Sequence, residues 1–136
     1  MKKAAEQVLC YHFDAERLEA VRAVMKKLSI PCRELPEESW REKVGLLLGR
    51  RGFAPAPQDG KEGFDFPDAV MVLDHIQGKR LDQVLAAMKT GGVPPIRYKA
   101  TVTPYNVLWT LRRLCETMKK EHAYMTEGAK NDGGKA

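Results

Sequence analysis

The sequence predicts an α/β fold in which two similar βαβα units build one small, mixed sheet of four strands packed with helices. Short apolar runs alternate with helical periods along both halves of the 136-residue chain. Residues 8–31 also recur 63 positions later, with eight identities at His12, Arg17, Leu18, Val21, Ala23, Met25, Lys26 and Pro31. Such agreement indicates an internal duplication. Because a unit of about 60 residues buries too little surface to be comfortably stable alone, we expect the two units to share one core.

The first unit is expected to span residues 1–51. Residues 8–13 form a short apolar run with aromatic content, which predicts a strand. Asp14 is a favoured N-cap for a helix over residues 15–28, where apolar residues recur every three or four positions. Pro31 restricts the residue before it to extended geometry, and residues 32–35 predict a second strand. A second helix is expected over residues 37–50, with glutamates near its N-terminus.

Residues 52–67 are rich in glycine and proline and predict a linker, whose phenylalanines should lie against the core. The second unit, residues 68–125, begins with a strand over residues 69–76 and a helix that stops at Gly91. Residues 96–102 alternate between apolar and polar, which predicts an edge strand with one wet face. Thr103 and Pro104 predict the start of a long helix that runs to about Tyr124, and residues 126–136 are expected to be a disordered tail.

Composition narrows the classes of function. The chain is 43% hydrophobic and 30% charged and has no apolar run near the roughly 20 residues of a membrane helix. Its three cysteines form no CxxC pair, which predicts reduced thiols in a cytoplasmic protein. Cys10 and Cys115 fall in apolar stretches and should be inert, whereas Cys32 should be exposed. The net charge of +5 is spread over both halves, and no phosphate-binding glycine motif is present, so no cofactor is expected.

Two histidines occupy equivalent places at the ends of the first strands of the two units. Open α/β sheets often bind ligands at such strand ends. His12 and His75, with Asp74 and Asp14 close by in sequence, would supply the ligands of a metal site or a pair of acid-base groups. The alternative is that duplication copied a histidine that hydrogen-bonds a loop. No HxH or HExxH spacing supports the metal site.

An aromatic-plus-arginine face lies on the last predicted helix. Tyr105, Trp109 and Arg112 follow an i, i+4, i+7 spacing there, whereas the first unit has Glu38 and Glu42 in place of the two aromatic residues. Such a face is typical of protein interfaces and also of surfaces on which nucleic-acid bases stack. In the alternative interpretation, Trp109 belongs to the core and packs on the linker phenylalanines.

A second candidate surface is basic. Arg97 and Lys99 lie on the wet face of the predicted edge strand and would form a basic patch with Arg112 and Arg113. Charged residues on an edge strand more often serve as a solvated face that prevents edge-to-edge aggregation.

The second unit also carries a recognisable set of polar and aromatic residues before and after its leucine-spaced helix: Thr103, Asn106, Trp109, Thr110, Glu121 and His122. Over about residues 68–125 the chain resembles a small bacterial family, the domain of unknown function DUF3783. The N-terminal unit lacks the TxxNxxW signature. The resemblance implies an uncharacterised bacterial protein and brings no reaction, cofactor or partner.

These observations lead to three hypotheses. The first is a small, non-catalytic, cytoplasmic interaction or regulatory module, which forms a homodimer or docks another protein through the aromatic-plus-arginine face. The second is a nucleic-acid or nucleotide-binding protein that uses the basic patch. The third is an enzyme or metal protein that uses the histidine pair and Asp74.

Overall fold

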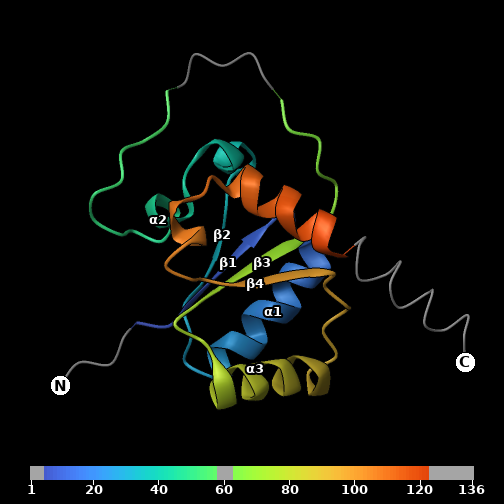
Figure 1. The fold of residues 1–136 in the computed structure, drawn as a ribbon. Helices are drawn as coiled ribbons and strands as arrows, with labels where there is room; N and C mark the ends of the chain where they lie inside the picture. Colours follow the sequence, from blue (N-terminus) through green and yellow to red (C-terminus); the bar gives the residue numbers. More distant parts are fainter. Residues whose placement is uncertain (1–4, 58–62, 123–136) are drawn as a thin grey trace, which may run out of the picture.

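The computed structural model describes residues 5–57 and 63–122 and contains a four-stranded mixed sheet in the order β2-β1-β3-β4 (Figure 1). The strands are β1 (Gln7–Tyr11), β2 (Cys32–Glu34), β3 (Val70–Asp74) and β4 (Tyr98–Thr101). The helices are α1 (Ala15–Lys27), α2 (Val44–Leu47) and α3 (Gly78–Thr90), with 3-10 turns η1 (Glu37–Arg41) and η2 (Asn106–Leu108) and a further helix over residues 111–122. The predicted α/β class and mixed four-stranded sheet are confirmed.

The two central strands, β1 and β3, are antiparallel, and each pairs in parallel with the second strand of its own βαβ crossover. Leu9 lies opposite Val72, which is the residue 63 positions later in the chain. The register is symmetric about this pair, since Val8 lies opposite Leu73 and Cys10 lies opposite Met71. β2 and β4 become the two edges of the sheet, so the edge position expected for residues 96–102 is confirmed.

Helices α1 and α3 cover one face of the sheet (Figure 1). Because side chains alternate along a strand, Val8 and Cys10 of β1 and Met71 and Leu73 of β3 point to this face. They pack against the apolar stripes of the two helices, which include Val21, Val24, Met25, Val84 and Met88. Asp14 begins α1 as predicted, since its side chain accepts a hydrogen bond from the Arg17 backbone N–H at 2.7 Å.

The opposite face carries η1, α2, η2 and the helix over residues 111–122 (Figure 1). Leu9 and Tyr11 of β1 and Val70 and Val72 of β3 pack there with Leu111. All five residues of β3 are buried. Coverage by helices on both sides explains why the central strands read as continuous apolar runs instead of alternating ones.

The helix predicted over residues 37–50 is wrong. The chain forms η1, leaves helical geometry at Glu42 and Lys43, and then makes only the single helical turn of α2. Lys43 pairs with Thr110 in an antiparallel bridge, and the Val44 N–H donates to the Trp109 carbonyl at 2.8 Å. This pairing with a distant segment holds Glu42 and Lys43 in extended geometry, although the spacing of apolar residues predicts a helix there.

The helix predicted from Pro104 is wrong at its start for the same reason. Trp109 is extended, with φ −84° and ψ 153°, and the Leu111 N–H donates to the Glu42 carbonyl at 2.8 Å. The two bridge hydrogen bonds are thus reciprocal. Thr110 caps the helix over residues 111–122, because its hydroxyl accepts a hydrogen bond from the Arg113 N–H at 3.1 Å.

The linker phenylalanines lie against the core, as expected. Phe66 is buried, and its ring packs 5.5 Å from Phe64 and 5.4 Å from Tyr98 between ring centres. The ring of Phe53 lies directly against the backbone of Gly45 in α2. The predicted strands are all present and are shorter than expected by one to three residues.

The helices in the described ranges are too short or too polar to cross a membrane. The disordered tail expected over residues 126–136 lies outside the described residues.

Candidate functional site

The antiparallel pairing of β1 and β3 places His12 and His75 at opposite ends of the sheet. Each histidine follows its own strand, and the two strands run in opposite directions over five paired residues. His12 lies level with position 69 of the other strand, six residues from His75, and at about 3.4 Å per residue this separates the two histidines by roughly 20 Å along the sheet. The prediction that His12, His75 and Asp74 form one site is therefore wrong, because His12 lies at one end of the sheet and His75 and Asp74 lie at the other. Across residues 5–57 and 63–122, no group of three histidine, cysteine, aspartate or glutamate side chains is placed to hold a metal ion.

His12 connects the end of β1 to the linker. Its backbone is left-handed, with φ 58°, a geometry in which histidine is enriched among non-glycine residues. Its Nδ1 lies 2.5 Å from the Phe66 carbonyl oxygen and its Nε2 lies 2.7 Å from Glu37 Oε2. Both ring nitrogens therefore face acceptors, and the ring stacks on Tyr11 with 4.0 Å between centres. These contacts match the alternative interpretation of His12 as a histidine that hydrogen-bonds a loop.

A cavity of about 580 Å³ opens beside His12 at this end of the sheet. Its charged lining is mixed in sign and comes from α1, from the segment before β3 and from the segment before β4. Arg17 and Asp14 pair with each other at 2.5 Å, while Arg97 and His122 contribute from the second unit. The cations of this cavity are thus partly neutralised by its own carboxylates.

At the other end of the sheet, Asp74 forms the most buried ionic contact of the described chain. Its side chain is 1% exposed, and Arg50 donates to both carboxylate oxygens at 2.9 and 2.6 Å. Gln7 adds a third hydrogen bond at 3.0 Å. The hydrogen bond to Asp74 raises the pKa of Arg50 above its usual range. His75 lies beside the pair, 3.3 Å from Arg50 and 3.7 Å from Asp74, and is left-handed like His12.

Sequence reasoning missed this pair. Arg50 lies in the segment that was assigned to the end of a helix, and nothing local marks it as the partner of a residue 24 positions away. An aspartate at the end of an otherwise apolar strand is the one available signal, since a buried carboxylate requires a partner.

The aromatic-plus-arginine face does not form a single helical stripe, because the helix begins only at residue 111. Tyr105 is 77% exposed. Trp109 is half-buried and packs against the core on the face of the sheet that carries η1, α2 and η2. Arg113 stacks over the Trp109 ring at 4.4 Å. Arg112 faces the other way, over Trp40 at 5.8 Å. Trp109 is thus partly buried against the core, but the tryptophan that meets a linker phenylalanine is Trp40, 6.1 Å from Phe64 between ring centres. Leu108, at 60% exposure, was not among the residues predicted for a surface site.

The four residues of the predicted basic patch each contact different neighbours. Lys99 is exposed, and its Nζ donates to the Ile96 carbonyl at 2.6 Å. Arg97 lines the cavity beside His12. Arg112 pairs with Glu116 at 3.3 Å and lies over aromatic rings, and Arg113 lies over Trp109. Each cation is thus placed by its own local partners.

The signature residues of the second unit have local structural roles. The Thr103 hydroxyl accepts hydrogen bonds from the backbone N–H groups of Tyr105 and Asn106, at 3.2 and 3.0 Å. Asn106 returns a bond, since its side-chain oxygen accepts from the Thr103 N–H at 2.8 Å, and its amide donates to the Thr101 carbonyl at 2.9 Å. Together with the Thr110 cap, these contacts shape the turn between β4 and the last helix. The signature residues therefore have a structural role, which is to hold this turn in place.

Two of the three cysteines match the expectation, and Cys32 differs from it. Cys10 and Cys115 are buried as predicted, and burial raises the pKa of the Cys115 thiol to about 12. Cys32 is half-buried, and its Sγ lies 3.6 Å from Cys10 Sγ. This proximity depends on the register of β1 and β2, which the spacing of the cysteines in the chain does not encode.

Comparison with known proteins gives one match. Residues 69–125 match the family described as "Domain of unknown function (DUF3783)". No curated protein and no solved structure matches the chain. The matched range begins one residue before β3 and contains the whole second βαβ crossover, η2 and the helix over residues 111–122. The resemblance to DUF3783 predicted from the Thr103–Asn106–Trp109 signature is therefore confirmed for the second unit.

Proposed function

We propose that this chain is a non-catalytic docking module that binds another protein through the η2 patch, defined as Tyr105 and Leu108. These are the large hydrophobic side chains with high exposure in the described part of the chain, at 77% and 60%. They sit on a turn that is held rigidly by the Thr103 and Asn106 hydrogen bonds. A rigid, exposed aromatic-aliphatic pair is the usual composition of an interface anchor.

The corresponding turn of the first unit carries the observation on which the proposal rests. Lys43 and Thr110 pair at a spacing of 67 residues, and both follow a 3-10 turn. Counted from this bridge, Tyr105 corresponds to Glu38, which is exposed, and Leu108 to Arg41, which is half-buried. The 3-10 turn of the first unit thus carries charged residues at both corresponding positions. The apolar residues of η2 are not required by the fold, which favours a role in binding.

The surroundings of the η2 patch suit an acidic partner. The exposed cation Arg113 lies over the ring of Trp109, the residue that follows Leu108, and the chain carries a net charge of +5. Complementary charge steers encounter and suppresses wrong partners, while the apolar pair supplies affinity. Self-association would bring like charges together, so we propose that the partner is a different, acidic protein and not a second copy of this chain.

A further observation supports a binding role over a catalytic one. The ionisable groups at the strand ends are occupied by internal contacts, with Asp74 bound to Arg50 and His12 bound to Glu37 and the Phe66 carbonyl. We also propose a cytoplasmic location, because three cysteines without a CxxC pair are typical of proteins kept in a reducing compartment.

Site-specific photo-crosslinking tests the proposal. The photoreactive residue p-benzoylphenylalanine replaces Tyr105 in the full chain, expressed in cells of the source organism, and irradiation is expected to yield a discrete protein adduct. The matched control carries the same residue at Lys89, an exposed position of α3 on the opposite layer, and is expected to give no such adduct. Leu108→Arg introduces the residue type that the first unit has at the corresponding position, Arg41. It should reduce the yield of the adduct from position 105 about tenfold or more, since loss of an interface anchor costs at least about 1.4 kcal/mol of binding free energy.

The possible outcomes separate the alternatives. An adduct of twice the chain mass identifies a homodimer, and a nuclease-sensitive adduct supports nucleic-acid binding in place of the proposal. Equal labelling from positions 105 and 89, or an adduct that Leu108→Arg leaves intact, contradicts docking through the η2 patch. Circular dichroism of Leu108→Arg should show an unchanged melting temperature, because an exposed substitution rarely changes stability by more than about 0.5 kcal/mol.

A further inference from the structure

Cys10 and Cys32 form a thiol pair that bridges the first βαβ crossover. Cys10 is the fourth of the five residues of β1 and is fully buried, whereas Cys32 is the first residue of β2 and is half-buried. Cys32 lies opposite Val8 in the parallel ladder, and Val8 and Cys10 point to the same face of the sheet. The two sulfur atoms are consequently diagonal neighbours on that face, 3.6 Å apart.

From this geometry we infer that Cys10 and Cys32 are a reversible redox pair, which a peroxide converts to an intramolecular disulfide. A disulfide bond requires sulfur atoms about 2.05 Å apart, so the pair must close by about 1.5 Å. Cys32 is positioned to supply this movement. It follows Pro31 at the start of a three-residue edge strand, which is bonded to the sheet on one side only.

The two thiols are prepared for different steps. The hydrogen bond from Cys10, followed by the positive charge of Arg22, lowers the pKa of Cys32, although burial opposes this shift. The same hydrogen bond, with burial and the coulombic effect of Cys32, raises the pKa of Cys10. The half-buried thiol is therefore the nucleophile, and the fully buried thiol holds the proton that the later step releases.

The chemistry balances with one peroxide per pair. The Cys32 thiolate attacks an oxygen of hydrogen peroxide, the O–O bond breaks, hydroxide leaves, and Cys32 becomes a sulfenic acid. The Cys10 sulfur then attacks Cys32 Sγ, and the sulfenic hydroxyl leaves as water with the Cys10 proton. Counting the proton that Cys32 gave up at the start, two thiols and one peroxide yield one disulfide and two waters. A small dithiol reverses the reaction by exchange.

This site is independent of the proposed docking surface. Cys10 and Cys32 belong to the layer of α1 and α3, whereas the η2 patch lies on the opposite layer (Figure 1). The third cysteine, Cys115, is buried in that opposite layer and serves as an internal control.

Thiol counting by mass spectrometry tests the inference. The folded full chain is treated with equimolar hydrogen peroxide, denatured and alkylated with N-ethylmaleimide. Two of the three alkylation sites should be lost, the unalkylated mass should fall by two hydrogen atoms, and a peptide linking Cys10 to Cys32 should appear. Dithiothreitol should restore all three sites. Cys115→Ala should lose both of its two remaining sites in the same way.

Two variants separate this pair from general thiol oxidation. Cys10→Ala should stop at a sulfenic acid on Cys32 that dimedone labels, and Cys32→Ala should leave Cys10 reduced. Retention of all three alkylation sites in the folded chain, a Cys32-linked dimer, or dimedone labelling that Cys10→Ala does not increase would overturn the inference. If Cys10→Ala fails to fold, the linked peptide from the unmodified chain decides, because it requires no variant.

Discussion

Replacing Arg50 with methionine tests whether the fold depends on the buried charge of Asp74. The substitution retains much of the apolar stem of Arg50 and removes its guanidinium. Asp74 then loses two of its three side-chain hydrogen bonds, those at 2.9 and 2.6 Å, and keeps the bond from Gln7. Its side chain is 1% exposed, so water does not replace the lost donors without a local opening of the structure.

The expected loss of stability follows from this geometry. Removing one partner of a buried ion pair costs about 3–5 kcal/mol, because the remaining charge stays desolvated. The Arg50 side chain is 33% exposed, and water entering from that side offsets part of the cost. We therefore expect Arg50→Met to lower the free energy of unfolding by about 3 kcal/mol. With a urea dependence of about 2 kcal/mol per molar, the unfolding midpoint should fall by about 1.5 M.

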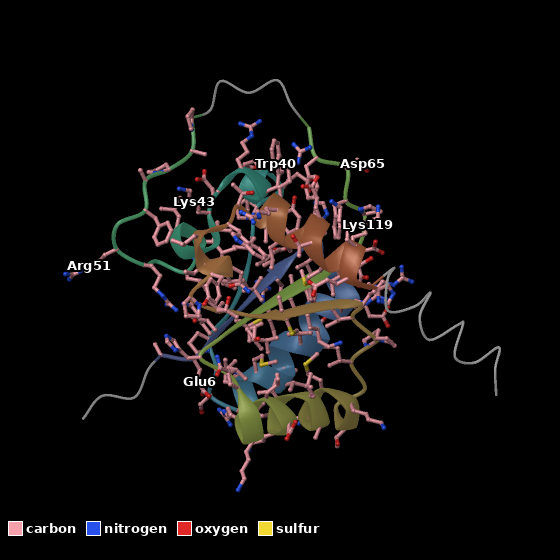
Figure 2. All side chains as sticks on the ribbon, viewed as in Figure 1. Glu6, Trp40, Lys43, Arg51, Asp65 and Lys119 are labelled. Atoms are coloured by element: carbon pink, nitrogen blue, oxygen red, sulfur yellow. The ribbon has the colours of Figure 1, made fainter. Side chains whose placement is uncertain are left out.

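Arg51→Met is the matched control, since it makes the same chemical change one residue further along. Arg51 is exposed, and Figure 2 shows it projecting away from the body of the protein. Its substitution should change the free energy of unfolding by less than about 0.5 kcal/mol. Adding Asp74→Asn to Arg50→Met should recover at least about 1 kcal/mol, because a neutral amide costs less to bury than a carboxylate. Equal urea midpoints for the two methionine variants would refute the argument.

Two further predictions concern local packing and acid stability. Gly45→Ala should lower the free energy of unfolding by about 1–3 kcal/mol, because the Phe53 ring occupies the space of the new methyl group, whereas Gly63→Ala meets open space and should be neutral in the same thermal melts. The hydrogen bond from the Arg17 backbone, with its guanidinium, lowers the pKa of Asp14, so the stability this carboxylate adds is present above its unfolded pKa and lost as pH falls through the folded value. Asp14→Asn keeps a capping oxygen and should flatten the acid side of the stability–pH curve, and an unchanged acid side would contradict this.

Local sequence signals predicted the elements whose causes are local. Asp14 was identified as an N-cap from residue type and position, and it caps α1 through the Arg17 backbone. The apolar runs of β1 and β3 and the stripes of α1 and α3 were found because burial on one helix face or inside a sheet leaves a periodic pattern. The DUF3783 resemblance was found because its signature shapes a turn within one short segment.

The same reasoning failed where a distant segment decides the backbone. The apolar spacing around Trp40 and Trp109 suits a helix, yet the bridge between Lys43 and Thr110 extends the chain at both places. Helix propensity amounts to tenths of a kilocalorie per residue, and a tertiary backbone pairing overrides it. The candidate sites were affected in the same way, since the antiparallel centre of the sheet separates His12 from His75.

The sequence by itself therefore determined the α/β class, the order of the strands and helices along the chain, the similarity of the two units, and the residues available for a site. Only the tertiary structure decided which of them meet: Asp74 with Arg50, Cys10 with Cys32, and neither histidine with the other. The physical reason is that strand direction and register are set by packing of the whole core. These choices leave no mark on any one strand, although they place every side chain of the sheet.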